Sequence, residues 1–277
     1  MNPADAIPAS FADRALFEPI AAWLGRFAAP GVPIHAELDA LLAQAAPAAR
    51  SGDGAAIRFV LPAGDVEGYE ARIFASGEVP TRSGDWHDFF NALAWCAWPR
   101  TKAACNRLHL AELHARTAAG LPGRGPRRDA LTQFDECGIV VVSADTEFPA
   151  LLAAHEWEEA LWTRRARLLQ STRFLVFGHG TWDQLRAPFV GLCAKALFRV
   201  VDPAWLALPA AQALAETDAW LAAHLTANID TLTPRSLSPL PLLGIPGVTA
   251  DNECAAYYRD TRQFRPRRRT TPSAPPT

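Results

Sequence analysis

The chain has 277 residues, of which 49% are hydrophobic and 20% are charged. This composition allows a sizeable buried core and excludes a chain that is disordered throughout. No apolar run approaches the ~18 residues of a membrane span. The first residues, MNPADAIPASF, lack the basic and apolar regions of a secretory signal. We therefore expect a cytoplasmic protein without membrane contact.

The net charge of −2 hides an uneven distribution of basic residues. Residues 99–128 carry seven cations and one anion, and residues 259–269 carry six arginines and one aspartate. The rest of the chain is acidic, and this asymmetry indicates an anionic partner. The chain also has five cysteines, but none are spaced as C-x-x-C, so we expect reduced thiols and neither a metal nor another cofactor.

Apolar spacing and breaker residues predict the elements of the first half. In chain order these are helices within 1–50, strands at 57–61 and 69–74, and helices over 86–98 and about 100–117. Asp85 is a suitable N-cap for the helix over 86–98. Pro99 breaks the helix that Asp85 opens, so the polar faces of two neighbouring helices can meet across a cleft.

The second half is predicted in the same way, after a Gly- and Pro-rich loop at 120–126. The expected elements are a hairpin with strands 129–134 and 139–143, a long helix over 147–170, a strand at 174–177, a helix from Thr181 toward Lys195, and a helix over about 209–227. Together they predict an α+β fold, mainly helical with a small, mostly antiparallel sheet. We expect one compact domain over 1–264, with its helical part at 1–50, and a disordered Arg- and Pro-rich tail over 265–277.

Several motifs occur together in a fixed order. They are Thr81–Leu93 (TRSGDWHDFFNAL), Trp98–Asn106 (WPRTKAACN), Arg128–Glu136 (RDALTQFDE), Phe177–His179 (FGH) and Gly244–Gly247 (GIPG). In this order they resemble a proteobacterial family known as domain-of-unknown-function family 3025, over roughly residues 60–265. The resemblance implies the organisation of the chain and brings no activity, substrate or cofactor with it.

Two helix faces carry polar residues that can bind a ligand. His87 and Asn91 are four residues apart, and so are Lys102 and Asn106 on the next helix. An imidazole beside an amide suits acid–base chemistry, and a row of donors suits a phosphate or carboxylate. The alternatives are a histidine that bonds a nearby loop and a solvated charged face.

Two further candidates lie at the starts of elements. Arg128 and Asp129 enter the expected hairpin, where they form either an ion pair or part of a site. His179 lies in a Gly-His-Gly turn between a strand and a helix, where functional residues are common. Asp135 and Glu136 are interpreted mainly as residues of the hairpin turn.

Two functions from different classes fit these residues, and the sequence leaves open whether the chain is an enzyme. The first is a metal-independent enzyme, hydrolase- or transferase-like, acting on a small anionic substrate. Its catalytic residues would be His87, Asp129 and His179, and its substrate-binding residues Arg82, Asn91, Lys102, Asn106 and Arg128. The second is a non-enzymatic protein that uses the two basic segments to bind nucleic acid or another acidic partner, with weak nucleic-acid contact through the tail. The oligomeric state is not indicated.

Overall fold

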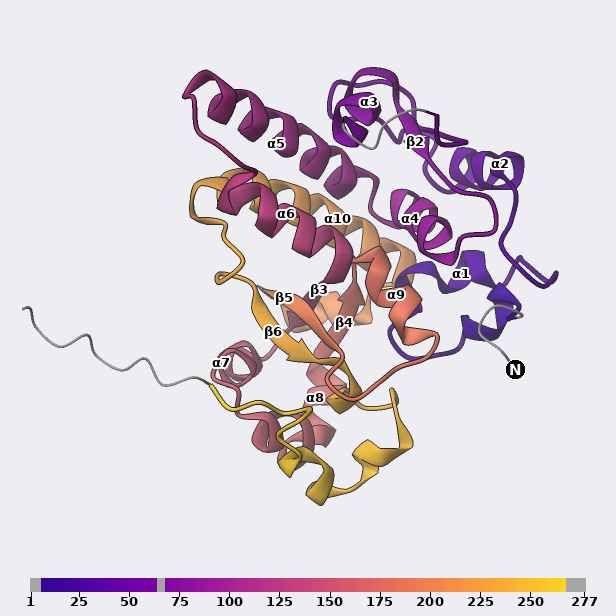
Figure 1. The fold of residues 1–277 in the computed structure, drawn as a ribbon. Coiled ribbons are helices and arrows are strands. Elements are labelled where there is room, and N and C mark those ends of the chain that lie inside the picture. Colours follow the sequence, from indigo (N-terminus) through magenta and orange to yellow (C-terminus); the bar gives the residue numbers. More distant parts are fainter. Residues whose placement is uncertain (1–5, 64–67, 268–277) are drawn as a thin grey trace, which may run out of the picture.

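The computed structural model describes residues 6–63 and 68–267. Its centre is a four-stranded sheet in the order β4-β3-β5-β6 (Figure 1). The strands are β3 (Gly138–Ser143), β4 (Thr172–Val176), β5 (Cys193–Val200) and β6 (Ser238–Pro241). β3 pairs antiparallel with β4 and parallel with β5, and β5 pairs antiparallel with β6. The fold is α+β and mainly helical, as expected from the sequence.

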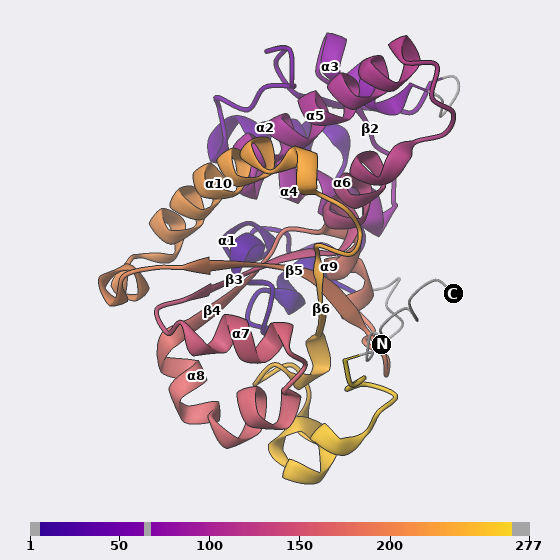
Figure 2. The same cartoon turned by 90° about the vertical axis from the view of Figure 1, so that its left-hand side faces the viewer.

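Helices cover both faces of this sheet (Figures 1 and 2). α6 (Gly125–Cys137) and α10 (Ala210–Ala227) lie on one side, and α7 (Glu147–Ala153) and α8 (Arg165–Ser171) lie on the other. All six residues of β3 are buried, which is the pattern of a strand that is covered on both faces. Its Ile-Val-Val-Val run suits such a position, because β-branched side chains pack well on a pleated surface.

α4 (Trp86–Ala97) and α5 (Pro99–Ala118) begin as their sequences predict. The Asp85 carboxylate accepts from the backbone N–H of Asp88, and Pro99 occupies the first turn of α5, where a missing N–H costs nothing. The start of α5 is also capped from outside. The two carboxylate oxygens of Asp218 in α10 accept from the N–H groups of Arg100 and Thr101, at 3.0 and 2.8 Å.

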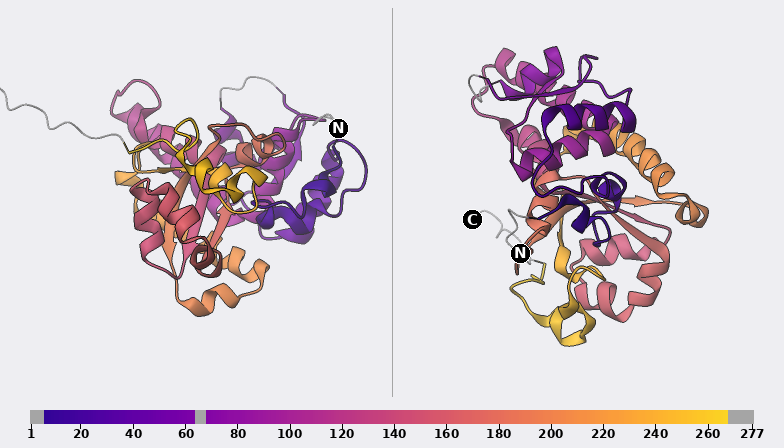
Figure 3. Two further views of the ribbon diagram at one scale, coloured as in Figure 1. Left: turned by 90° about the horizontal axis from the view of Figure 1, so that it is seen from below. Right: turned by 90° about the vertical axis from the view of Figure 1, so that its right-hand side faces the viewer.

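Most of the helices and strands other than the central sheet, the helices that cover it, and α4 and α5 are short. The remaining elements are α1 (Ala21–Leu24), α2 (His35–Ala45), β1 (Arg58–Val60), α3 (Tyr69–Ser76), β2 (Glu78–Pro80), α9 (His179–Leu185), the π-helical turn Glu159–Thr163, and the 3₁₀ turns Pro8–Phe11, Glu18–Ile20, Pro203–Ala207, Ile229–Thr231, Leu242–Gly244, Ala250–Glu253 and Ala255–Arg259. β1 and β2 pair in parallel as a second, small sheet. The N-terminal segment (indigo in Figure 3) lies against α9, where the Trp182 indole donates to the Leu16 carbonyl.

The predicted hairpin at 129–143 is wrong, because its first strand is part of α6. Pro126 lies in the first turn of that helix, and Ala130, Leu131 and Phe134 are buried at helical spacing. Asp135 and Glu136 therefore lie in the last turn of a helix and not in a hairpin turn. The strand expected at 69–74 is likewise helical, as α3, since a left-handed glycine lies at each end of that segment.

Two predicted helices are also corrected. The segment 147–170 is interrupted after α7, where His155 has a φ of +64°, and continues through a π-helical turn into α8. The helix from Thr181 toward Lys195 ends at Leu185, and Lys195 lies in β5. No helix in residues 6–63 or 68–267 is long and apolar enough to cross a membrane.

Most of the predicted disordered tail, 265–277, falls on residues 268–277, outside the described residues. Its first residue is anchored: the Arg265 carbonyl accepts from the Trp157 indole at 2.9 Å. The domain boundary and the disorder of the tail stay predictions.

Candidate functional site

A cavity of about 820 Å³ opens beside the N-terminal halves of α3 and α4. Its opposite wall is formed by residues of α5 and α6, and the first residue of α9 closes one end. Polar side chains dominate the lining. They are Tyr69, Glu70, Arg82, His87, Asp88, Asn91, His109, Arg124, Arg128, Thr132, Asp135, Glu136 and His179. Five helices, α3, α4, α5, α6 and α9, thus contribute to one site.

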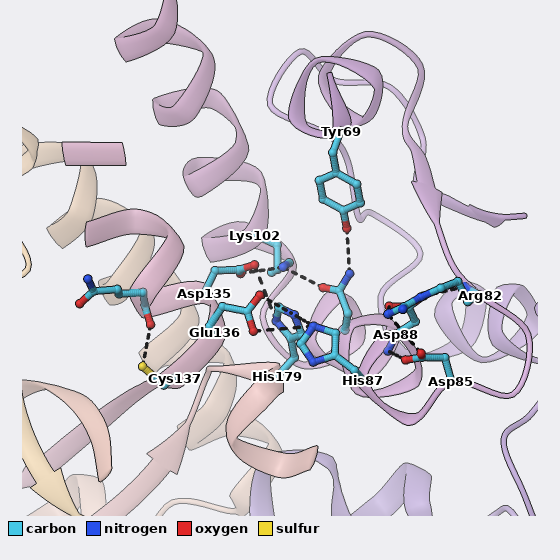
Figure 4. A network of polar contacts seen from close by, with 12 residues as sticks. Tyr69, Arg82, Asp85, His87, Asp88, Lys102, Asp135, Glu136, Cys137 and His179 are labelled. Atoms are coloured by element: carbon cyan, nitrogen blue, oxygen red, sulfur yellow. Dashed lines mark hydrogen bonds and ion pairs between the residues drawn. The ribbon is translucent and has the colours of Figure 1, made fainter. Parts of the chain in front are cut away.

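At one end of the cavity three side chains converge, which we call the histidine–glutamate cluster: His87, Glu136 and His179 (Figure 4). The Nε2 atoms of the two imidazoles are 3.1 Å apart. The Glu136 carboxylate lies beside both of them, with Oε1 at 3.6 Å from Nε2 of His179 and Oε2 at 3.7 Å from Nε2 of His87. The three residues come from α4, α6 and α9.

Two glycines allow α9 to begin against the end of α6. A Cβ atom at Gly178 would lie 2.3 Å from the backbone nitrogen of Gly138. A Cβ atom at Gly180 would lie 2.7 Å from Oε2 of Glu136 and 2.9 Å from its carbonyl oxygen. Such separations are well inside van der Waals contact, so larger residues would push the two helices apart. The Gly-His-Gly sequence therefore sets the imidazole of His179 against Glu136.

A chain of buried polar contacts runs from the cluster to the cavity's far side (Figure 4). The Lys102 ammonium donates to the Asp135 carboxylate at 2.6 Å and to the Asn91 amide oxygen at 2.9 Å. The Asn91 nitrogen in turn donates to the Tyr69 hydroxyl at 3.0 Å. Burial alone would raise the pKa of Asp135, but Lys102 and His179 outweigh it and lower that pKa. Asp135 is thus an ionised carboxylate beside His179, and Lys102 holds it in position.

Burial shifts the pKa values of His179 and Glu136 in the cluster in opposite directions. Burial lowers the pKa of His179 to about 3, although Asp135 opposes this shift, so the ring is neutral near pH 7. Burial raises the pKa of Glu136, and His87 opposes that shift. Glu136 accepts no hydrogen bond from any residue in the described ranges. The carboxylate therefore lacks the partners that usually stabilise a partly buried charge.

Two residues on the wall that α5 and α6 form also have buried polar atoms without partners: His109 of α5 and Arg128 of α6. We call this pair the donor wall. His109 is only 3% exposed, and its Nδ1 atom has no hydrogen-bond partner. The Nε of Arg128 is buried without a partner as well, and among the described residues no carboxylate pairs with this guanidinium. Burial lowers the pKa of His109, with Glu70 opposing, so its ring is neutral near pH 7.

The structure brings together five of the residues that the sequence selected. Arg82, His87, Asn91, Arg128 and His179 all line the cavity. The guanidinium of Arg82 is held by the Asp88 carboxylate, at 2.8 Å, and so is less open to a ligand than Arg128.

Three selected residues lie elsewhere. Lys102 is buried behind Asn91 and acts through it. Asn106 is buried away from the lining, where its amide bonds Glu70 and the Gly52 backbone. Asp129 is exposed outside the cavity and lies 3.9 Å from Arg124, so it does not orient either cluster histidine.

The sequence analysis did not select Glu136, Asp135 or Tyr69 as site residues. His109 follows Lys102 and Asn106 on the same helix face, but it was given no role in the site. A signal for Glu136 and Asp135 exists once residues 125–137 are assigned to a helix. Arg128, Thr132, Asp135 and Glu136 then recur at helical spacing, and all four line the cavity. Two imidazole nitrogens and a carboxylate oxygen are also a donor set that a transition-metal ion accepts.

Comparison with known proteins adds a family. The family model described as Protein of unknown function (DUF3025) matches residues 57–268, a span that contains every residue of the cavity. No curated protein and no solved structure matches the chain.

Proposed function

The chain belongs to the DUF3025 family, and we propose that it is a hydrolase for a small substrate that carries an anionic group. The histidine–glutamate cluster activates the attacking water, and the donor wall binds the anionic group. One observation carries this proposal: the unpaired guanidinium of Arg128 and the cluster face the same cavity of about 820 Å³. That volume is typical of a small-molecule site.

The donor wall supports an anionic ligand because it costs free energy when empty. A buried donor without a partner destabilises a fold by roughly 1–3 kcal/mol. The fold keeps two such atoms, one on each of the lining residues His109 and Arg128, and Arg128 is near enough to contribute, after burial, to lowering the pKa of His109. An oxyanion that accepts from Arg128 removes this cost, and a planar guanidinium suits a phosphate or carboxylate in particular.

Water is the nucleophile that the lining favours. No serine or cysteine lines the cavity as formed by the described residues. Burial raises the pKa of Tyr69 far above its ordinary value, so its phenol stays protonated. In the proposed reaction the water oxygen bonds to the substrate's phosphorus or carbonyl carbon and gives its proton to the cluster. The bond to the leaving oxygen breaks, that oxygen takes up the proton, and one water is consumed.

Nucleic-acid binding is the weaker alternative, because carboxylates already neutralise part of both basic segments. Lys102 pairs with Asp135, Arg127 with Glu112, Arg259 with Glu158 and Arg262 with Asp260. Only Lys and Arg side chains that are not already paired can neutralise phosphates and release their counterions. Weak binding by the tail and a cytoplasmic location remain predictions.

The test begins with the anion. Sulfate and inorganic phosphate are titrated into the full-length protein, and binding is followed by calorimetry and by the melting temperature. We expect binding by the wild type and by Arg107→Met, which removes an exposed arginine from α5, and a loss of at least tenfold in Arg128→Met. Equal binding by all three proteins would contradict the proposal.

Hydrolysis is then measured on 4-nitrophenyl esters: a phosphate monoester, a phosphodiester and a carboxylic ester that bears a second, free carboxylate. For the ester that is turned over, Arg128→Met should mainly raise KM and Glu136→Gln should mainly lower kcat. Turnover that is unchanged in Glu136→Gln would place the chemistry outside the cluster.

A further inference from the structure

We propose that the histidine–glutamate cluster is a binding site for one divalent transition-metal ion, with His87, Glu136 and His179 as its protein ligands. The inference rests on the site of the proposed function and deepens it, since it names what activates the water. It does not depend on the substrate, so metal binding can be tested by itself.

The separations between the three donor atoms fit one ion. A Zn–N distance of about 2.0–2.1 Å and tetrahedral angles place neighbouring ligand atoms roughly 3.3 Å apart. The two Nε2 atoms are 3.1 Å apart, Oε1 of Glu136 lies 3.6 Å from that of His179, and Oε2 lies 3.7 Å from that of His87. With one oxygen counted for Glu136, the three ligand atoms all lie within 4.8 Å of one another. A point about 2 Å from one oxygen of Glu136 and from both nitrogens therefore requires only small side-chain shifts.

Hydrogen bonding does not account for this convergence. Two imidazoles that face each other through Nε2 form at most one hydrogen bond between these atoms. Distances of 3.6 and 3.7 Å are too long for the carboxylate to accept from either ring. Three potential ligand atoms thus meet around one point with at most a single hydrogen bond among them, and a cation that displaced the shared proton would engage all three.

The surroundings of His179 match the second layer of a metal site. Metal-bound histidines usually present their other ring nitrogen to a carboxylate or a carbonyl group. Nδ1 of His179 is buried without a hydrogen bond, and Oδ2 of Asp135 lies 3.7 Å from it. Lys102 holds the Asp135 carboxylate in place at 2.6 Å. A small shift of the ring toward Asp135 would complete a hydrogen bond from Nδ1 and leave the Nε2 lone pair of His179 directed at the cluster.

The donor set selects the class of ion. Calcium and magnesium prefer oxygen ligands, whereas imidazole nitrogen suits zinc, iron, cobalt, nickel and copper. Three protein ligands also leave a coordination position open, as in catalytic sites. That position faces the cavity, because the side chains of His87 and Glu136 are 34% and 44% exposed there. A water bound at that position becomes more acidic, which is what the proposed hydrolysis needs.

The experiment uses full-length protein stripped of metal with a chelator and then titrated with Co²⁺, whose visible absorption reports imidazole and carboxylate ligands. Zn²⁺ and Mg²⁺ are titrated by calorimetry in parallel. The variants are His87→Ala and Glu136→Gln, both at partly exposed positions that tolerate substitution, with His114→Ala as the control. His114 is an exposed histidine of α5. Circular dichroism and the melting temperature of each stripped protein establish that it is folded.

We expect one Co²⁺ or Zn²⁺ per chain, far weaker binding of Mg²⁺, and unchanged binding by His114→Ala. Both cluster variants should lose at least tenfold in affinity. The proposal is overturned if no ion binds at a ratio of one per chain, if Mg²⁺ binds as tightly as Zn²⁺, or if the cluster variants bind like the wild type. A wild-type protein that binds sulfate but no metal ion would overturn this inference and leave the anion site of the proposed function standing.

Discussion

Nε2 of His87 and Nε2 of His179 lie 3.1 Å apart, although 92 positions separate the two residues in the chain. One ring projects from the first turn of α4 and the other from the first residue of α9. α9 packs against both α4 and α6, and α6 supplies Glu136. The contact between the two rings therefore depends on how α4, α6 and α9 are placed relative to one another.

Gly180→Ala should damage the cluster without removing any of its side chains. The new methyl group would lie 2.7 Å from Oε2 of Glu136, so the carboxylate must move away from the two imidazoles. We expect Zn²⁺ affinity to fall at least about tenfold, because ligand orientation controls affinity. The measurement is calorimetric titration of the stripped protein.

Gly25→Ala is the matched control for that substitution. Its Cβ atom would meet only the Ala21 carbonyl, at an ordinary 3.7 Å. The control should bind Zn²⁺ like the wild type. A Gly180→Ala protein that binds metal normally would show that the approach of α9 to α6 does not set the cluster geometry.

Lys102→Met should destabilise the fold by roughly 3–5 kcal/mol, because it leaves the Asp135 carboxylate buried without its cation. Adding Asp135→Asn should recover part of that loss, since the uncompensated charge is then gone. Urea unfolding of both single variants and the double variant measures the coupling. The protein has one other lysine, Lys195, and Lys195→Met serves as the control. Additive effects of Lys102→Met and Asp135→Asn would mean that the pair is not coupled.

His109→Leu should make the protein more stable and less able to bind sulfate. The substitution removes a buried ring nitrogen without a partner, so we expect the free energy of unfolding to rise by roughly 1 kcal/mol. Sulfate affinity should fall, because the donor wall loses one of its two members. A stabilised protein with unchanged sulfate binding would assign His109 to packing alone.

The same variant carries a pH signature. Burial lowers the pKa of His109 in the folded protein, so the unfolded chain takes up the proton first as the pH falls. The wild type therefore loses stability as the pH drops below ~6.5, the ordinary histidine pKa. His109→Leu lacks this contribution, and its advantage should widen between pH 7 and pH 5. Urea midpoints across that range provide the check.

Local signals in the sequence predict part of this site. The Asp85 cap and the Pro99 break define α4 and α5, and their spacing correctly places His87 and Asn91 on a face that lines the cavity. The strand-to-helix turn at His179 is also predicted, because glycines flank it. These features depend on neighbours within a few residues in the chain, which is the range that capping and periodicity report.

Glu136 shows why the rest was not predictable in the same way. Its segment ends in Asp-Glu-Cys-Gly, which has the composition of a turn, and a short run of residues before it fits a strand as well as a helix. Packing of Ala130, Leu131 and Phe134 decides for the helix. The approach of Gly178 and Gly180 to α6 is tertiary, so no local pattern brings Glu136 beside the two histidines.

The two proposed sites share one cavity, and their ligands should therefore reinforce each other. A divalent ion at the histidine–glutamate cluster adds positive charge at one end, while Arg128 supplies it from the wall. Sulfate should bind more tightly to the Zn²⁺-loaded protein than to the stripped protein. Because such coupling is reciprocal, Zn²⁺ should bind more tightly by the same factor when sulfate is present. Calorimetric titrations in both orders measure the two factors, which must agree.

Arg128→Met should weaken sulfate binding in the stripped and the loaded protein alike but leave Zn²⁺ affinity in the absence of sulfate unchanged, since Arg128 is not a ligand. Sulfate affinity that does not respond to Zn²⁺ would place the anion outside the field of the ion and separate the donor wall from the cluster.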